Sequence, residues 1–337
     1  MRGRTRGLAG VAASLLITLF GLILVTFFIG RVMPIDPVIA IVGDHAPEDV
    51  MLRVRTELGL DQPLPVQFAI YLQHLVHGDL GRSVMTSNTV TQDIARYFPA
   101  TIELATVAIL IATVLGVPLG VLAAVRQGTR LDQGIRVFCL AGHSVPIFLL
   151  ALLSLLIFYA TLGWAPGTGR SDVGLEGLVP VVTGFLTIDA AIAMDWDVFY
   201  DACAHLVQPA GVLAYFALAY IARMTRAFML DALSGEYVIT ARAKGLSALR
   251  VIWRHAFGNI AVRLITVLAL TYAGLLEGAV VTETVFSWPG LGQYLTVSLL
   301  NADMNAVLGA TLVVGLIYMV LNLLADTAYR LLDPRVR

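Results

Sequence analysis

Residues 235–259 read GEYVITARAKGLSALRVIWRHAFGN and form the longest basic interruption in an otherwise very apolar chain. Ser234 is placed to N-cap a short helix, and Glu236 in the first turn complements the helix dipole. Gly245 can adopt the left-handed conformation that ends a helix. Ser247 can then cap a second helix, in which apolar residues lie beside two arginines. The stretch therefore predicts two short helices joined by a turn at Gly245.

The first of these helices is too short to cross a membrane. About ten residues give a length of about 15 Å, which is half of what a bilayer core requires. A helix of this length is also marginal by itself in water. We therefore expect it to be held by the membrane surface or by a partner protein.

The string ARAKGL at 241–246, followed by His255, Ala256 and Asn259, resembles the cytoplasmic coupling motif of ATP-binding-cassette importer permeases of the dipeptide/oligopeptide branch. In that family two short helices dock into a groove on a separate ATPase subunit. The alternative is a basic helix that lies on anionic lipid. Relatives commonly carry a proline a few residues past the asparagine, where this chain has Arg263, so the entry into the next membrane helix departs from the family pattern. The resemblance assigns ATPase coupling to Glu236, Tyr237, Thr240, Ala241, Arg242, Lys244, Gly245, Arg254, His255 and Asn259.

The resemblance extends over almost the whole chain, from about Pro34 to Arg337. TETVFSWPGLG at 282–292 is similar to the family's re-entrant outer turn between the fifth and sixth spans, with Trp288, Pro289 and Gly290 at its centre. Before a proline and a glycine, Trp288 is expected to anchor at the membrane interface. Shorter matches to the family are MPIDP at 33–37, HGDLGRS at 77–83, FPATIEL at 98–104 and LLDPRVR at 331–337.

Composition places the chain among integral membrane proteins. Hydrophobic residues make up 58% of it and charged residues 13%, far from the balance of soluble domains. Cys139 and Cys203 both lie in or beside apolar runs and show neither a metal-ligand spacing nor a disulfide framework, so both are expected to pack in membrane helices. Three arginines precede a long apolar run near the start, which predicts an uncleaved first helix.

The apolar windows and the charges between them predict an all-α polytopic membrane protein of the type I ABC importer permease fold, with about six transmembrane helices. Arginine and lysine gather at the N-terminus, at 126–136 and at 223–263, whereas acids outnumber bases in the other long connections. The positive-inside rule then places both termini in the cytoplasm. Residues 1–99 are expected to hold the first span and a long extracytoplasmic segment, and residues 100–337 a permease core of five spans. The expected spans are 8–29, 100–125, 137–162, 206–222, 264–281 and 306–324.

The extracytoplasmic segment is predicted to contain short interfacial helices at about 47–58 and 66–77. His74 and His77 share one helix face, but no third ligand has a suitable spacing, so no metal site is predicted.

Helix breakers interrupt several spans: Gly116, Pro118 and Gly120 in the second, Pro146 in the third and Pro209 in the fourth. One interpretation is ordinary kinked packing. The other is a pathway lined by helices that bend between two states.

Ionisable residues at membrane depth are few, namely Glu103, His143, Glu277 and His205. Because each is costly in lipid, each should face the bundle interior, a partner subunit or a cavity. Glu277, Glu103 and His143 are the candidates for a substrate path, and Glu277 could equally pair with a helix of the partner subunit.

Lys244 is the chain's only lysine, and Gly245 and Leu246 follow it instead of Ser or Thr, so no Walker A loop is present. No catalytic, cofactor-binding or metal-binding residues are predicted. The resemblance implies that two partner ATPase subunits bind ATP and Mg²⁺, and that a homologous second permease and an extracytoplasmic binding protein complete the importer in a bacterial cytoplasmic membrane. Dipeptides or short peptides are the expected substrates, with nickel chelates, glutathione or opines as other possibilities in the family. An ion-coupled secondary transporter and a membrane scaffold are the remaining alternatives, and the absence of an inverted repeat counts against the former.

The charge pattern predicts which loops face the outside of the cell. Single cysteines at Ser87 and Asp195 should react with a membrane-impermeant thiol reagent in intact cells. A cysteine at Ser247 should react only after permeabilisation. Labelling of that cysteine in intact cells would overturn both the orientation and the coupling assignment.

Overall fold

A computed structural model describes residues 2–32, 37–43, 45–57 and 59–332 of the chain. The motifs at 33–37 and 331–337 fall largely outside these residues. Throughout the described part the regular structure is helical, and the nearest approach to a strand is an isolated antiparallel bridge between Arg82 and Thr89. The expected all-α architecture is therefore present.

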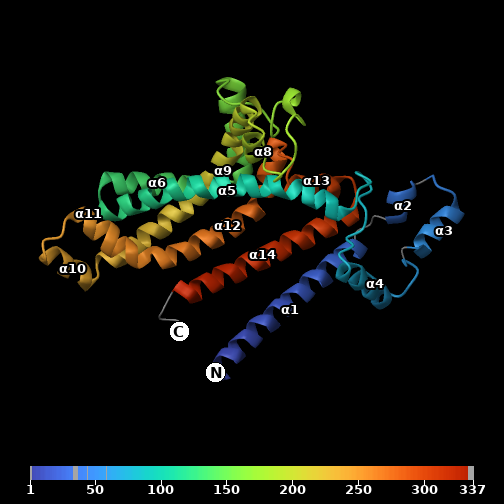
Figure 1. Ribbon diagram of the computed structural model, residues 1–337, viewed down its shortest axis with the longest axis horizontal. Coiled ribbons are helices and arrows are strands. Elements are labelled where there is room, and N and C mark those ends of the chain that lie inside the picture. Colours follow the sequence, from blue (N-terminus) through green and yellow to red (C-terminus); the bar gives the residue numbers. More distant parts are fainter. Residues whose placement is uncertain (1, 33–36, 44, 58, 333–337) are drawn as a thin grey trace. The chain divides into compact units, whose positions relative to one another are not determined.

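The chain divides into two compact units, each of which is described by itself (Figure 1). Unit 1 comprises Met1–Phe98 and Gln293–Met319, and unit 2 comprises Pro99–Gly292 and Val320–Arg337. Unit 1 contains α1 (Arg2–Val32), α2 (Pro37–Val42), α3 (Glu48–Glu57), α4 (Leu64–Val76), the start of α5 (Val90–Val125), most of α13 (Leu291–Leu300) and the first half of α14 (Met304–Leu332). Unit 2 contains the rest of α5, α6 (Arg130–Ser144), α7 (Ile147–Ser154), η1 (Leu155–Thr161), η2 (Val173–Leu175), α8 (Leu186–Ile192), α9 (Trp196–Leu233), α10 (Glu236–Ala243), α11 (Ala248–Arg250), η3 (Val251–Phe257) and α12 (Gly258–Phe286).

Five helices among the described residues are long and apolar enough to cross a membrane, and the number is six if one bent pair of helices counts as a single span. The bent pair, Arg130–Ser144 and Ile147–Thr161, corresponds to the expected span 137–162 and turns by 100°. Val145 at the bend is extended, with φ −86° and ψ 127°, because the ring of Pro146 disfavours a helical residue before it. Pro146 is thus confirmed as a helix breaker.

The other helix breakers lie inside helices that continue past them. Pro118 lies inside the continuous helix α5, and Pro209 lies inside the continuous helix α9. Gly116 and Gly120 serve close packing instead: a Cβ on Gly116 would lie 3.3 Å from the Leu218 carbonyl oxygen, and one on Gly120 would lie 2.6 Å from the Ala222 carbonyl oxygen. Glycine is the only residue that lets α5 approach α9 this closely.

Helix α9 is the centre of unit 2, where it packs against α6, α7, α8 and α12 (Figure 1). Most of the side chains that it buries are small. Alanine is frequent where α9 meets α5, as expected where helices associate without a hydrophobic driving force from water. The buried alanines of this core are Ala100, Ala105, Ala108, Ala112, Ala210, Ala214, Ala217, Ala219, Ala222 and Ala279.

In unit 1 the two short helices expected at about 47–58 and 66–77 are present as α3 and α4. Phe27 of α1 packs against α4, with ring centroids 5.1 Å from Phe68 and 5.7 Å from Tyr71. The connection after α4 is held by Asp303, whose buried carboxylate accepts hydrogen bonds from the Ser83 hydroxyl at 2.5 Å and the Met85 N–H at 3.2 Å. His74 pairs with Asp79 (3.1 Å) in this exposed region.

The contact between α5 and α9 leaves no room for a side chain at Gly120. Gly120→Ala should destabilise the protein by about 1–3 kcal/mol, because the added methyl group overpacks the Ala222 carbonyl and the Thr225 side chain. Thermal unfolding in detergent measures the change. Gly211→Ala is the matched control, since Gly211 lies in α9 with open space at its Cβ position. Equal stability of the two variants would contradict the packing role.

Candidate functional site

The basic stretch at 235–259, called the coupling segment below, starts directly after α9. Its first helix, α10, has 8 residues, slightly fewer than expected. The predicted N-cap is wrong: Ser234 ends α9 and its hydroxyl donates to the Asp231 carbonyl at 2.8 Å, whereas Gly235 precedes α10 without a side-chain cap. Glu236 does lie in the first turn of α10, near the positive end of its dipole.

Gly245 makes the turn that the sequence predicted. Its φ is +77°, in the left-handed region, and its N–H donates to the Arg242 carbonyl at 2.9 Å. The next N–H, of Leu246, reaches the Ala241 carbonyl at 3.3 Å, so the last carbonyls of α10 are satisfied. A Cβ at Gly245 would meet no atom of the chain within 4 Å, so the backbone conformation is the constraint within this chain.

The second helix of the segment differs from the expectation of a short, separate element. Ser247 occupies its N-cap position without a side-chain hydrogen bond, and α11 then continues through the π-helical turn η3 into α12. Arg263, which replaces the family's usual proline, leaves this helix unbroken. Its guanidinium pairs with Asp231 of α9 at 3.2 Å and lies 5.1 Å from the ring centre of Phe228.

A small apolar cluster anchors the coupling segment to the transmembrane helices. Val238 and Ala241 of α10 are buried together with Val251 and Ala256 of η3. Their partners come from α5, α9 and α12, and are Val121, Ala124, Met229, Ala232 and Ile260. The segment is therefore fixed on the ends of three long helices and does not hang as a free loop.

The opposite face of the segment is exposed. Of the residues assigned to coupling, Ala241 is a buried anchor and His255 is half-buried. Asn259 is exposed, and its amide donates to the His255 carbonyl at 2.7 Å. The exposed assigned residues are Glu236, Tyr237, Thr240, Arg242, Lys244, Gly245, Arg254 and Asn259, to which the structure adds the apolar side chains Ile239, Leu249 and Trp253.

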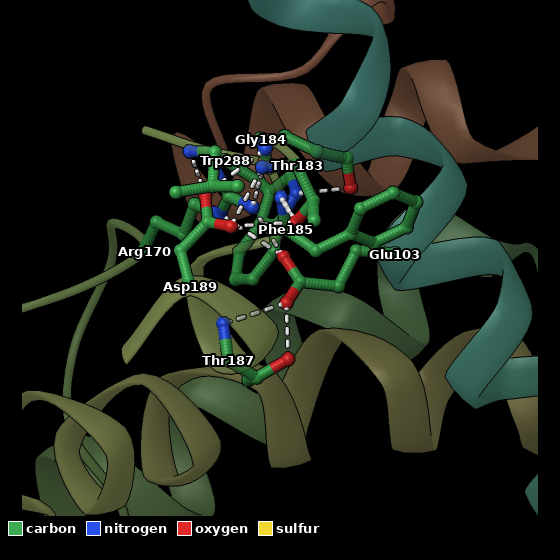
Figure 2. A network of polar contacts seen from close by, with 10 residues as sticks. Glu103, Arg170, Thr183, Gly184, Phe185, Thr187, Asp189 and Trp288 are labelled. Carbon is green, nitrogen blue, oxygen red and sulfur yellow. Dashed lines mark hydrogen bonds and ion pairs between the residues drawn. The ribbon is translucent and has the colours of Figure 1, made fainter. Parts of the chain in front are cut away.

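A second polar site lies within unit 2 around Glu103 of α5 (Figure 2). The Glu103 side chain is 3% exposed and pairs with Arg170, which comes from the connection between η1 and α8. Thr187 at the start of α8 donates both its N–H (3.0 Å) and its hydroxyl (2.5 Å) to Glu103. Arg170 also donates to the Gly184 carbonyl at 2.8 Å and lies 5.7 Å from the ring centre of Trp288. Glu103 was a substrate-path candidate, and in this structure its carboxylate is fully engaged by the protein.

Asp189 organises the turn next to this pair (Figure 2). Its carboxylate accepts hydrogen bonds from the N–H groups of Val182, Thr183 and Gly184 and from the Thr183 hydroxyl, at 2.6–3.3 Å. Burial by itself raises the pKa of Asp189, but these donors outweigh it and hold the pKa below its ordinary value. The turn thereby presents the Gly184 carbonyl to Arg170.

The end of α12 forms a third buried polar cluster in unit 2. Glu283 accepts from the Thr101 hydroxyl (2.6 Å) and the Gly292 N–H (2.7 Å), and Ser287 ends the helix in the left-handed conformation. Trp288 is 1% exposed and its indole N–H donates to the Ala100 carbonyl at 3.0 Å. The interfacial-anchor prediction for Trp288 is therefore wrong, because the ring belongs to the protein core.

The remaining path candidates are accessible from the surface of unit 2. Glu277 is exposed, and a Cβ on either neighbouring glycine, Gly274 or Gly278, would meet no atom within 4 Å. His143 is exposed and stacks on Phe216 at 5.6 Å between ring centres. His143, Gly274 and Gly278 line a cavity of about 350 Å³ at the Pro146 bend. The Glu277 side chain is therefore open to contact with a molecule that lies over this surface of unit 2.

Sequence reasoning missed Arg170, Thr187, Asp189 and Glu283. Arg170 and Asp189 were counted only as loop charges, and nothing in their spacing links them to Glu103, 67 residues or more away. The one available signal was Glu103 itself, since a carboxylate in an apolar run needs a cationic partner.

Comparison with known proteins agrees with this architecture. Residues 116–337 match the family described as "Binding-protein-dependent transport system inner membrane component", and residues 6–105 match its "membrane comp, N-term" family. The chain is 41% identical over 322 residues to the probable D,D-dipeptide transport system permease protein DdpB of Escherichia coli K12, covering 96% of this chain and 94% of that protein. It is also 41% identical to the di/tripeptide transport system permease protein DppB of Pseudomonas aeruginosa UCBPP-PA14, covering 95% of each. An inward-facing structure of the MetNI methionine ABC transporter aligns with a TM-score of 0.53 at 17% identity over 72% of this chain and 97% of the other, which is a likeness of fold.

The Glu103–Arg170 pair should be costly to break from one side only. Arg170→Met leaves a buried carboxylate without its cation and should lower stability by about 3–5 kcal/mol. The double variant Glu103→Gln/Arg170→Met should lose less stability than the two single variants lose together. A double-mutant cycle on thermal unfolding measures the difference. Additive losses would show that the two side chains do not interact.

Proposed function

Because the chain belongs to the family of binding-protein-dependent transport system inner membrane components, we propose that it moves dipeptides or short peptides as the permease subunit of an ATP-driven importer in a bacterial cytoplasmic membrane. The observation that carries the proposal is the coupling segment. It combines an anchored apolar side with an exposed side of aromatic, aliphatic and basic residues.

This two-sided arrangement supports docking to a protein better than adsorption to lipid. The exposed side mixes Tyr237, Ile239 and Thr240 with the charged groups of Glu236 and Arg242. A helix that lies on a membrane would carry a continuous apolar face toward the lipid, but the buried residues of α10 face the chain's own helices. The partner proposed for this surface is an ATPase subunit, which binds the ATP and Mg²⁺ for which this chain has no Walker A loop.

The substrate class rests on the names of the relatives. Those named above are permeases of D,D-dipeptide and di/tripeptide transport systems, each covered almost from end to end. The comparisons give no support to the alternative of an ion-coupled transporter. Chelated metals, glutathione or opines stay open as other substrates of such an importer.

An importer of this family also implies further partners. We expect a homologous second permease, a second ATPase and an extracytoplasmic binding protein. The exposed carboxyl group of Glu277, flanked by open glycines on an apolar helix, supports a protein or a water-filled path over this surface, because lipid would leave the charge unsolvated.

The coupling role makes Gly245 a sensitive position. Gly245→Arg adds a bulky cation at a residue with φ of +77° on the exposed side of the segment. Membrane insertion should survive, because the apolar spans direct it. Binding-protein-stimulated ATP hydrolysis by the reconstituted importer should fall at least about tenfold, equivalent to about 1.4 kcal/mol at the interface.

Gly128→Arg is the matched control for this experiment. Gly128 also has a positive φ, of +78°, is exposed, and has open space at its Cβ position, but it lies in the connection between α5 and α6. It therefore carries the same backbone strain and the same added charge outside the coupling segment. Normal stimulation in Gly245→Arg, or equal losses in both variants, would reject the proposed docking surface.

A further inference from the structure

Three metal-ligating side chains meet at the start of α9, in a part of unit 2 that the transport proposal does not use. Asp201 and His205 are one turn apart on α9, and Asp172 comes from the connection that precedes α8. One ligand atom from each residue lies within 4.8 Å of the other two. Asp172 lies 29 residues before Asp201 in the chain, so sequence spacing gives no sign of this group.

The orientation of His205 determines what its ring can bind. Its side chain is 2% exposed, and Nδ1 lies 3.0 Å from the Asp201 carbonyl oxygen. A carbonyl oxygen can only accept, so Nδ1 carries a proton in this contact, which leaves Nε2 as the nitrogen that can bind a metal ion. The same arrangement, a backbone carbonyl holding Nδ1–H, orients histidine ligands in metal sites.

The other ring nitrogen of His205, Nε2, lies near the carboxylate of Asp172. Asp172 Oδ1 lies 3.7 Å away, which is too long for a hydrogen bond. Two ligands of a tetrahedral zinc ion, each bound at about 2.0–2.1 Å, lie about 3.3–3.4 Å apart, so a small movement of Asp172 completes the geometry. The Asp172 side chain is 74% exposed and caps no backbone group at the start of η2, so it is free to make that movement.

Asp201 contacts both of the other residues. Asp201 is 15% exposed at its side chain, and its Oδ2 accepts the Asp172 N–H at 2.8 Å. Its Oδ1 lies 3.2 Å from His205 Nδ1. The connection that carries Asp172 is thus already tied to α9 beside the His205 ring.

From this geometry we propose that Asp172, Asp201 and His205 form a binding site for a divalent transition metal of the zinc class, with water at the open position. One imidazole nitrogen and two carboxylates suit Zn²⁺ better than Ca²⁺ or Mg²⁺, which prefer oxygen ligands alone. The bound ion fastens the connection before α8 to α9. Arg170 lies two residues before Asp172, so the metal also steadies the partner of Glu103.

The test is isothermal titration calorimetry, in which Zn²⁺ alone is titrated into the purified full-length chain. The wild-type chain should bind an ion that Asp172→Asn binds more than about tenfold more weakly. Asp172→Asn is suited to this test because its exposed side chain has no packing role. Asp172→Cys should restore binding and favour Cd²⁺, because thiolate selects softer metals.

His74→Gln is the matched control, since His74 also pairs with an aspartate but is exposed and belongs to no group of three possible ligands among the described residues. Its affinity for Zn²⁺ should equal that of the wild type. Unchanged affinity in Asp172→Asn, loss of binding in His74→Gln, or no Zn²⁺ binding to the wild type would each overturn the proposal. None of these results depends on transport, so the site and the proposed function can fail separately.

Discussion

Close packing of small side chains around α9 is the constraint on which unit 2 depends. Lipid tails are as apolar as leucine, so helices in a bilayer gain little by hiding large apolar groups from it, and association relies on close van der Waals contact. Alanines on α5 and α9 and Ala279 of α12, with Gly116 and Gly120 at the nearest approach of α5 to α9, supply that contact. The same packing explains how Pro118 and Pro209 sit in unbroken helices, because neighbouring helices hold the backbone on both sides.

Packed alanine side chains carry no polar groups, so they do not determine where the helices end. The polar clusters of unit 2 supply this information. Glu103 and Asp189 fix the connections around α8, and Glu283 fixes the end of α12. Each buried carboxylate is surrounded by donors, which offsets the cost of removing its charge from water. These polar clusters hold the connections between helices in place. The coupling segment is instead held by the small apolar cluster around Val238 and Ala241 and by the left-handed turn at Gly245.

Features that depend on local backbone chemistry could be predicted from the sequence, and features that depend on distant partners could not. The turn at Gly245 follows from glycine's access to positive φ, and the bend at Pro146 follows from the effect of proline on the residue before it. Hydropathy was enough to locate the five long apolar helices, but not the 100° bend in the remaining predicted span. By contrast, Trp288 before a proline and a glycine has the pattern of an interfacial anchor, and only the tertiary structure brings the Ala100 carbonyl to its indole N–H. The pairing of Glu103 with Arg170 and the meeting of Asp172 with His205 depend in the same way on the fold of a long connection.

The continuity of α12 limits how a force on the coupling segment can act. From Ala248 to Phe286 the chain is helical for 39 residues, a length of about 58 Å. At one end Ile260 is buried with Val121 of α5, and at the other Glu283 accepts from Thr101 of α5. Because α12 is bound to α5 at both ends and to α9 along its length, bending one helix alone would break a buried polar contact or open the alanine packing. A displacement of residues 235–259 therefore acts on α5, α9 and α12 together, and these contacts favour movement of the three helices as one body over the bending of single helices.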